Sequence, residues 1–193
     1  MTEPVNVQAK PADVVVDALP VTPWLREHFA EEWLAEAKQE ATVSDQNARR
    51  REIVFAVSFA ESYLFEFVRD QILGSSLQRV SEFFVPGDHR GIRSRWEQVM
   101  ERLREADLIP KLPPSGNRHD REDWERLVDY RNGLVHARAS RPRTRRQPEK
   151  EQPRPSKSTL RSLEPGWAVK VVVKRARRLH QAAGTEPPVW LTP

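Results

Sequence analysis

Four polar side chains that can exchange protons or form hydrogen bonds recur at helical spacing near the middle of the chain. They are Glu125, Asp129, Asn132 and His136. Because a helix turns once in about 3.6 residues, this spacing places all four on one helical face. Imidazole titrates near neutral pH, and here it stands next to an amide and two carboxylates. The pattern therefore predicts an acid/base patch.

Arg131 lies in the apolar stripe of the same helix, which it shares with Leu127, Val128 and Val135. An unpaired buried guanidinium is strongly destabilising, so Arg131 is expected to have a carboxylate partner. We expect that partner to be Glu61, at the border of the apolar stripe of an earlier helix. The pair can serve chemistry at an anionic group, or it can be a structural ion pair that only fixes helix register.

The composition excludes several other kinds of chemistry. The chain has no Cys, which removes disulfides, thiolate catalysis and Cys-based zinc sites and favours a reducing, cytoplasmic setting. No histidine belongs to a cluster with metal-ligand spacing, so we expect no metal and no cofactor. The four other histidines are predicted to lie on the surface: His28, His89, His119 and His180.

The length of 193 residues fits one domain with a single core. The start of the chain lacks the pattern of a signal peptide, and no run of about 18 apolar residues occurs, so we expect no membrane span. We interpret residues 1–20 as a flexible N-terminal arm and residues 21–193 as one helical domain.

Hydrophobic periodicity predicts an all-α fold, a bundle of about five helices. Asp120 and Glu164 are predicted caps of the last two main helices, Gly74 and Gly184 are predicted stops, and Trp190 is expected to dock back. The short run 169–173 is rich in valine and also suits a strand. The predicted main helices are 23–41, 45–73, 92–108, 121–138 and one from Pro165 to Gly184, with a further short helix possible over 75–84.

A basic, proline-punctuated loop is predicted over 138–158, before the last helix. Residues 138–157 hold eight Arg or Lys against two Glu, a net +6 in a chain of net +4, so the remainder carries −2. Such a strip suits a polyanion, because phosphate contacts release counterions, although a solvated linker would have the same composition. The candidate nucleic-acid-binding residues are Arg138, Arg141, Arg143, Arg145 and Arg146.

The segment 124–137, which reads WERLVDYRNGLVHA, resembles the R-x4-H signature of the HEPN superfamily. The second helix, with FAVSFAESYLFE over 55–66, is similar to the helix that family members place opposite the signature. The closing segment 165–190 is similar to the last helix and tail of several prokaryotic members. The resemblance covers about residues 53–190, with the middle loops unmatched.

The resemblance implies a helical bundle, commonly dimeric, and in many members a metal-independent endoribonuclease that acts as a toxin or in phage defence. His136 would assist proton transfer at the attacking 2′-hydroxyl or the leaving oxygen, Arg131 would stabilise charge on the scissile phosphate, and Asn132 would orient either group. Glu61 and Asp129 would support them. The products would be a 2′,3′-cyclic phosphate and a 5′-hydroxyl.

The spacing of Arg131 and His136 favours a dimeric active unit. Five residues correspond to about 140° around an ideal helix, so both side chains reach one phosphate only if the helix distorts or two copies converge. Aromatic residues outside the apolar stripe of the second helix (Phe55, Phe59 and Phe65) fit an interface between copies. Members regulated by nucleotidyl transfer from a partner antitoxin carry Tyr two places after the His, where this chain has Arg138. The departure argues against pairing with that class of antitoxin, and the identity of any antitoxin or regulator is open.

Three functional hypotheses remain from the sequence. The first is an endoribonuclease in which the 138–158 loop guides RNA. The second keeps the fold and binds a nucleotide, RNA or protein without turnover. In the third, the signature is accidental and the basic strip is only a linker. The first requires Arg131 and His136 to lie near an open cleft.

Overall fold

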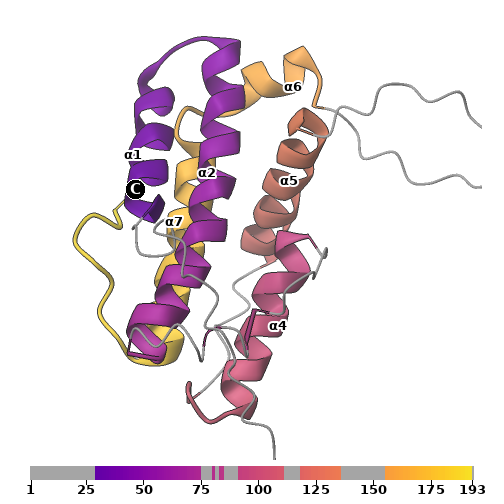
Figure 1. Cartoon of the computed structure of the whole chain (residues 1–193). Coiled ribbons are helices and arrows are strands. Elements are labelled where there is room, and N and C mark those ends of the chain that lie inside the picture. The colour runs from indigo at the N-terminus through magenta and orange to yellow at the C-terminus, as the bar shows by residue number, and fades with distance from the viewer. Residues whose placement is uncertain are drawn as a thin grey trace, which may run out of the picture.

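The computed structural model of the chain describes residues 29–74, 80, 83–84, 91–110, 118–135 and 155–192. Within these ranges all regular secondary structure is helical, as predicted, and the helices pack as a bundle (Figure 1). The elements are α1 (Phe29–Thr42), α2 (Gln46–Phe67) with a π-helical extension (Val68–Ile72), α4 (Ile92–Glu105), α5 (Arg118–Val135), α6 (Lys157–Ser162) and α7 (Trp167–Ala183).

Helix α2 with its extension begins and ends where local sequence signals predict. Asp45 is the N-cap of α2, and its carboxylate accepts hydrogen bonds from the backbone N–H groups of Asn47 and, at 3.3 Å, Ala48. At the other end of the helix, Gly74 takes a φ of +58°, a conformation that favours glycine. The predicted limits of the second helix are therefore confirmed.

Helix α2 occupies the centre of the bundle, between α1 and α5, with α7 behind it in Figure 1. A helix enclosed in this way needs apolar residues in several directions, which is what its sequence provides. Phe59, which lies outside the main stripe, is fully buried. The stripe itself is also buried, as predicted: Ile53, Val57, Ala60, Leu64, Phe67 and Val68.

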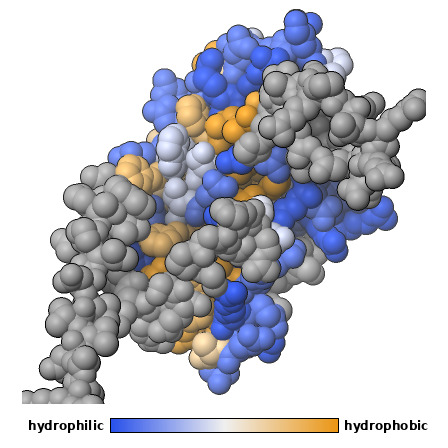
Figure 2. Space-filling model, turned by 45° about the vertical axis from the view of Figure 1, so that its right-hand side comes forward, coloured by the Kyte–Doolittle hydropathy of each residue, from blue (hydrophilic) through white to orange (hydrophobic). Residues whose placement is uncertain are grey.

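The remaining aromatic side chains of α2 pack within the chain. Phe55 stacks on Trp33 with ring centroids 5.7 Å apart, and Phe65 meets Phe84 edge-on at 5.3 Å. On the face shown in Figure 2, hydrophilic residues cover both ends and hydrophobic ones show mainly in the middle. Among the described residues the exposed large hydrophobic side chains are valines, and Phe55 and Phe65 are partly buried against the core.

Charged side chains of α2 bond to the ends of neighbouring helices. Glu66 Oε1 accepts from the N–H of Ala30 in the first turn of α1 (3.0 Å), and Glu52 Oε1 accepts from the N–H of Ala168 in the first turn of α7 (3.1 Å). Arg49 pairs with Glu52 at 2.8 Å. Acidic groups thus meet helix N-termini and a basic group a C-terminus, as helix dipoles favour. Arg49 also donates to the carbonyls of Glu40 (3.3 Å), Ala41 (3.4 Å) and Val43 (3.1 Å) at the end of α1.

Two predicted helix caps are wrong. Helix α5 starts at Arg118, so Asp120 lies inside its first turn, where its carboxylate binds Lys174 (2.5 Å) and Arg178 of α7. Glu164 does not cap α7, since Gly166, at a φ of +79°, precedes the helix. The Glu164 carboxylate instead pairs with Lys170 at 2.6 Å. In both cases the carboxylate that local sequence rules assign to a cap forms an ion pair with a basic side chain of α7 instead.

The final part of the chain is helical and its tail docks on the bundle, as predicted. The valine-rich run 169–173 lies inside α7, and Gly184, at a φ of +71°, ends that helix. The Trp190 ring meets Phe59 edge-on at 6.4 Å, and the next residue, Leu191, is fully buried. The short helix α6 (Lys157–Ser162), capped by Ser156, begins at the end of the region predicted as a basic loop and was not predicted.

His180 is buried, which corrects its predicted place on the surface. One ring nitrogen shares a hydrogen bond with the hydroxyl of Tyr63, and Nδ1 lies 2.8 Å from Thr185 Oγ1. Burial lowers the pKa of His180 and raises that of Tyr63. Both side chains therefore favour their neutral forms inside the bundle.

Several predictions fall on parts of the chain outside the described residues. They include the arm over 1–20, the start of the first helix at Thr22 and Pro23, and most of the short helix at 75–84. None of the helices described is both long enough and apolar enough to span a bilayer.

Candidate functional site

Arg131 and Glu61 form the predicted ion pair between α5 and α2. Arg131 Nη2 lies 3.6 Å from Glu61 Oε2, and the side chains are 22% and 33% exposed. The predicted partner is thus confirmed, but the guanidinium lies at the edge of the apolar contact and not at its buried centre. This partial exposure leaves the pair accessible from solvent.

Asn132 lies beside this pair. Its Oδ1 accepts a hydrogen bond from Arg131 Nη1 at 3.3 Å. Arg131 is therefore contacted by an amide oxygen from its own helix and by the Glu61 carboxylate from α2. The structure brings together three of the predicted site residues, Glu61, Arg131 and Asn132.

Asp129 is engaged on another side of α5. Its carboxylate lies 2.8 Å from Arg93 Nη2 of α4, and the same guanidinium donates to the backbone carbonyl of Glu125. The Glu125 carboxylate pairs with Arg121 at 2.9 Å. Both carboxylates of the predicted acid/base face are therefore paired with arginines, and Asp129 is bonded toward α4 and not toward Arg131.

The other predicted site residues lie outside the described residues. Helix α5 ends at Val135, directly before His136. The candidate RNA-binding residues follow in the segment that separates α5 from the described residues before α6: Arg138, Arg141, Arg143, Arg145 and Arg146.

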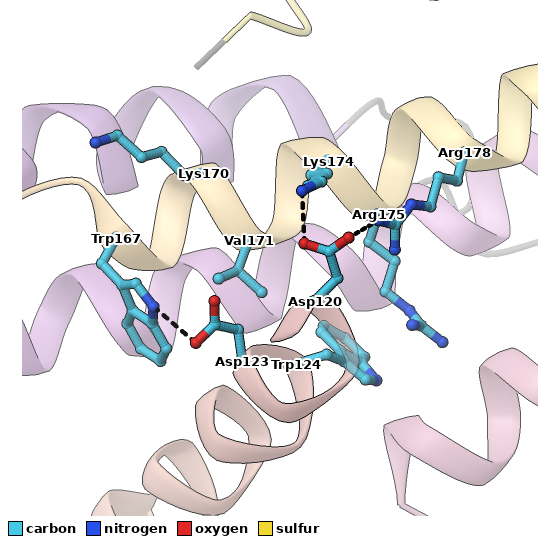
Figure 3. Close-up of a pocket in the computed structure, with 9 residues that line it drawn as sticks. All are labelled: Asp120, Asp123, Trp124, Trp167, Lys170, Val171, Lys174, Arg175 and Arg178. Carbon is cyan, nitrogen blue, oxygen red and sulfur yellow. Dashed lines mark hydrogen bonds and ion pairs between the residues drawn. The ribbon is translucent and has the colours of Figure 1, made fainter. Parts of the chain in front are cut away.

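A second candidate site, which the sequence did not predict, is a groove between the first half of α5 and α7. It has a volume of about 170 Å³ and combines acidic, basic and aromatic side chains (Figure 3). Trp167 Nε1 donates to Asp123 Oδ1 at 3.4 Å across it. The lining residues are Asp120, Asp123, Trp124, Trp167, Lys170, Val171, Lys174, Arg175 and Arg178.

Arg175 differs from the other cations of the groove because it has no carboxylate partner. Its guanidinium lies 4.5 Å from the Trp124 ring centroid and 4.9 Å from that of Trp96, and it makes no hydrogen bond or ion pair with the residues described. Desolvation lowers the pKa of Arg175 to about 10, against a weaker, opposing attraction to Glu97. Two π faces partly compensate the buried charge.

The sequence contains a signal for Arg175. Counted along α7, it stands seven residues after Ala168, three after Val172 and four before Leu179, all of them buried. It therefore occupies the apolar stripe of the last helix, as Arg131 does on α5. The argument that drew attention to Arg131 therefore draws attention to Arg175 as well, although the structure gives Arg175 two indole rings in place of a carboxylate.

The described residues contain no group of three or more His, Cys, Asp or Glu placed to hold a metal ion. Comparison of the chain with protein-family models, with curated proteins and with solved structures finds no match. The functional argument consequently rests on the residues of the two sites.

Proposed function

We propose that this protein is a metal-independent endoribonuclease of the HEPN type. The observation that supports the proposal best is the placement of Arg131 at the end of α5, half-buried and flanked by Glu61 and Asn132. His136 follows one residue after the last residue of this helix. Cation, amide and imidazole are the groups needed for attack by a 2′-hydroxyl on the neighbouring phosphate.

The proposed chemistry divides the work among three side chains. His136 transfers a proton at the attacking 2′-hydroxyl or at the leaving 5′-oxygen. Arg131 stabilises the charge that develops on the phosphate, and Asn132 holds the guanidinium or the phosphate in place. The 2′-oxygen forms a bond to phosphorus as the bond to the 5′-oxygen breaks, giving a 2′,3′-cyclic phosphate and a 5′-hydroxyl.

The geometry of the Arg131–Glu61 pair favours this role over a purely structural one. A tight charge-assisted hydrogen bond between guanidinium and carboxylate is about 2.7–2.9 Å long. The distance here is 3.6 Å, and both side chains are partly exposed. Glu61 therefore orients Arg131 through a loose ion pair and leaves the guanidinium within reach of a phosphate that approaches from solvent.

The basic segment supports RNA as the substrate. In the sequence it stands between Val135, the last residue of α5, and α6, and Figure 1 places α6 beside the C-terminal end of α5. Both anchor points of the segment thus lie at the end of the bundle that carries Arg131. A net charge of +6 over 138–157 would hold the phosphate backbone of RNA close to the site.

Two further parts of the proposal concern partners. Two copies of the signature converge in a homodimer, which brings Arg131 of one copy and His136 of the other to one phosphate. The biological role is that of a toxin or a phage-defence effector in the cytoplasm, controlled by an antitoxin or regulator still to be identified.

The deciding experiment compares the wild type with His136→Ala in a metal-free assay. Both proteins are incubated with total cellular RNA in EDTA, and the fragments and their end groups are analysed. His119→Ala is the matched control, because His119 is 90% exposed near the start of α5. We expect cleavage with cyclic-phosphate ends by the wild type and the control, and none by His136→Ala.

The second candidate function is a binding module of the same fold without turnover. The groove between α5 and α7 favours it, because that groove is a ligand-sized site that uses none of the three proposed catalytic residues. RNA binding by wild type and His136→Ala alike, with cleavage by neither, would support this module and contradict the nuclease.

A further inference from the structure

Three buried N–H groups without an acceptor lie together where α4, α5 and α7 meet. They are Nε of Arg175 and the indole Nε1 atoms of Trp96 and Trp124. The two indole rings are 5.7 Å apart, and both flank the Arg175 guanidinium. Buried donors in folded proteins are nearly always paired, so such a cluster needs an explanation. All three are donors, and a ligand that satisfied them would be an acceptor.

The other cations of the groove each have a carboxylate within ion-pair distance. Lys174 and Arg178 both bind the Asp120 carboxylate, and Lys170 pairs with Glu164. Figure 3 shows the Arg175 guanidinium turned away from Asp120 and toward Trp124, on the side where the Trp124 nitrogen also points. Arg175 is therefore the lining cation whose charge is not matched by a carboxylate at ion-pair distance.

The Asp123 carboxylate is likewise engaged, and it does not compete for Arg175. It pairs with Arg126 at 2.6 Å and accepts from Trp167 Nε1. The acidic group that acts on Arg175 is Glu97 of α4, an exposed residue that attracts the guanidinium without forming an ion pair. An anion that enters the groove can therefore reach Arg175, which has no carboxylate at ion-pair distance among the described residues.

We propose that this groove binds the phosphate group of a small phosphorylated molecule, with Arg175 as the principal anion-binding residue and the indole N–H of Trp124, which also lines the groove, as a further donor. Trp96 packs against Arg175 from outside the groove lining. This site uses none of the residues of the proposed nuclease reaction. It lies at the opposite end of α5 from Arg131.

A phosphate dianion fits the donor set. It offers acceptor oxygens and no donors, and the planar guanidinium fork matches its geometry. A cavity of about 170 Å³ takes a small molecule and not a folded partner. Trp167 and Val171 in the wall give the apolar part of such a molecule a surface to pack against.

Calorimetric titration of the full chain with AMP, inorganic phosphate and adenosine tests the proposal. We expect AMP to bind, adenosine to fail, and inorganic phosphate to bind more weakly than AMP if the apolar wall contributes. Equal binding of phosphate and AMP would assign the site to the free anion. Binding of neither AMP nor phosphate, or equal binding of adenosine, would overturn the proposal.

Substitution of Arg175 provides the matched comparison. Arg175→Met keeps an unbranched side chain between the two indoles and should weaken AMP binding about tenfold or more, as loss of a charge-assisted hydrogen bond does. Arg175→Lys, which keeps the charge without the fork, should lie between the two. The control is Arg161→Met, at an exposed position on α6. Unchanged affinity in Arg175→Met would contradict the assignment.

Indole N–H signals in NMR spectra report on the same contact directly. The chain has six Trp, and Trp96→Phe and Trp124→Phe identify two of the indole signals. Phosphate or AMP should shift these two more than the others, and Glu97→Gln should tighten binding by removing a nearby negative charge. Shifts confined to the other indoles would place the anion elsewhere and overturn the proposal. Because His136→Ala leaves this groove intact, failure of the nuclease does not affect this result.

Discussion

Arg49 and Arg175 are both arginines set into the bundle, and their surroundings are opposite. Arg49 is 6% exposed and binds the Glu52 carboxylate together with backbone carbonyls at the end of α1. Arg175 lies between two indole rings and makes no hydrogen bond with the described residues. The Arg49 guanidinium links α2 to the end of α1, whereas the Arg175 guanidinium makes no such bond between helices. A guanidinium whose N–H groups are bonded within the fold, such as that of Arg49, thus differs from one whose N–H groups remain available to a ligand, such as that of Arg175.

The largest effect is expected from Arg49→Met. It leaves the Glu52 carboxylate buried without its partner and removes the donors to the last turn of α1. We expect the free energy of unfolding to fall by about 3–5 kcal/mol, the usual result of breaking a buried pair. Urea unfolding measures it. The control is the neighbouring Arg51→Met, whose side chain is 48% exposed, and it should lower the free energy of unfolding far less than Arg49→Met.

His180 extends the comparison to a buried group that is held neutral. Burial lowers the pKa of His180 in the folded protein, whereas in the unfolded chain its pKa is about 6.5. As the pH falls below that value the unfolded chain takes up a proton that the folded protein resists, so stability decreases. Urea unfolding at about pH 7.5 and about pH 5.5 should show a larger loss for wild type than for His180→Gln. Equal losses would mean that His180 protonates freely in the fold.

Substitution of Arg131 is expected to affect the free energy of unfolding less than substitution of Arg49. Its pair with Glu61 is long and partly exposed, so Arg131→Met should lower the free energy of unfolding by less than about 1 kcal/mol. RNA cleavage should nevertheless fall by about 100-fold or more, because a charge that stabilises the transition state is lost. A loss of stability as large as that of Arg49→Met, with cleavage retained, would make the pair structural.

The smallest effect on stability is expected from Arg175→Met in the ligand-free protein. Removal of a desolvated charge offsets the loss of its contacts with Trp96 and Trp124, so the free energy of unfolding should change by less than about 1 kcal/mol, in either direction. Thermal unfolding without added phosphate measures this change. A loss of several kcal/mol would remove the distinction drawn between Arg49 and Arg175.

The parts of the fold that follow from local chemistry were predictable. Asp45 as a cap and Gly74 and Gly184 as stops depend on a few neighbouring residues, and so does the stripe of α2. Asp120 was assigned wrongly because a carboxylate near a helix start suits both a cap and an ion pair. Its partner Lys174 is 54 residues away, and sequence spacing does not show that contact.

Long-range placement also explains the successes and failures at the sites. The Glu61–Arg131 pair was predictable because each residue lies on or beside an apolar stripe and the charges are opposite. The Arg175 groove was not, because it depends on how α4, α5 and α7 meet. His180 lies four residues after buried Ala176, a periodic signal that its basic neighbours obscured. Helix α6 was missed because, in six residues, it buries only Leu160.

The hydrogen bonds from α2 side chains to α1 and α7 also predict the order in which the helices assemble. The bond from Glu66 to Ala30 joins residues 36 apart, and the connection between α1 and α2 is three residues long, whereas the bond from Glu52 to Ala168 joins residues 116 apart. Local contacts form quickly and distant ones slowly, because closing a longer loop costs more entropy. The α1–α2 hairpin should therefore assemble first, and docking of α7 onto it should limit the rate at which the groove between α5 and α7 appears.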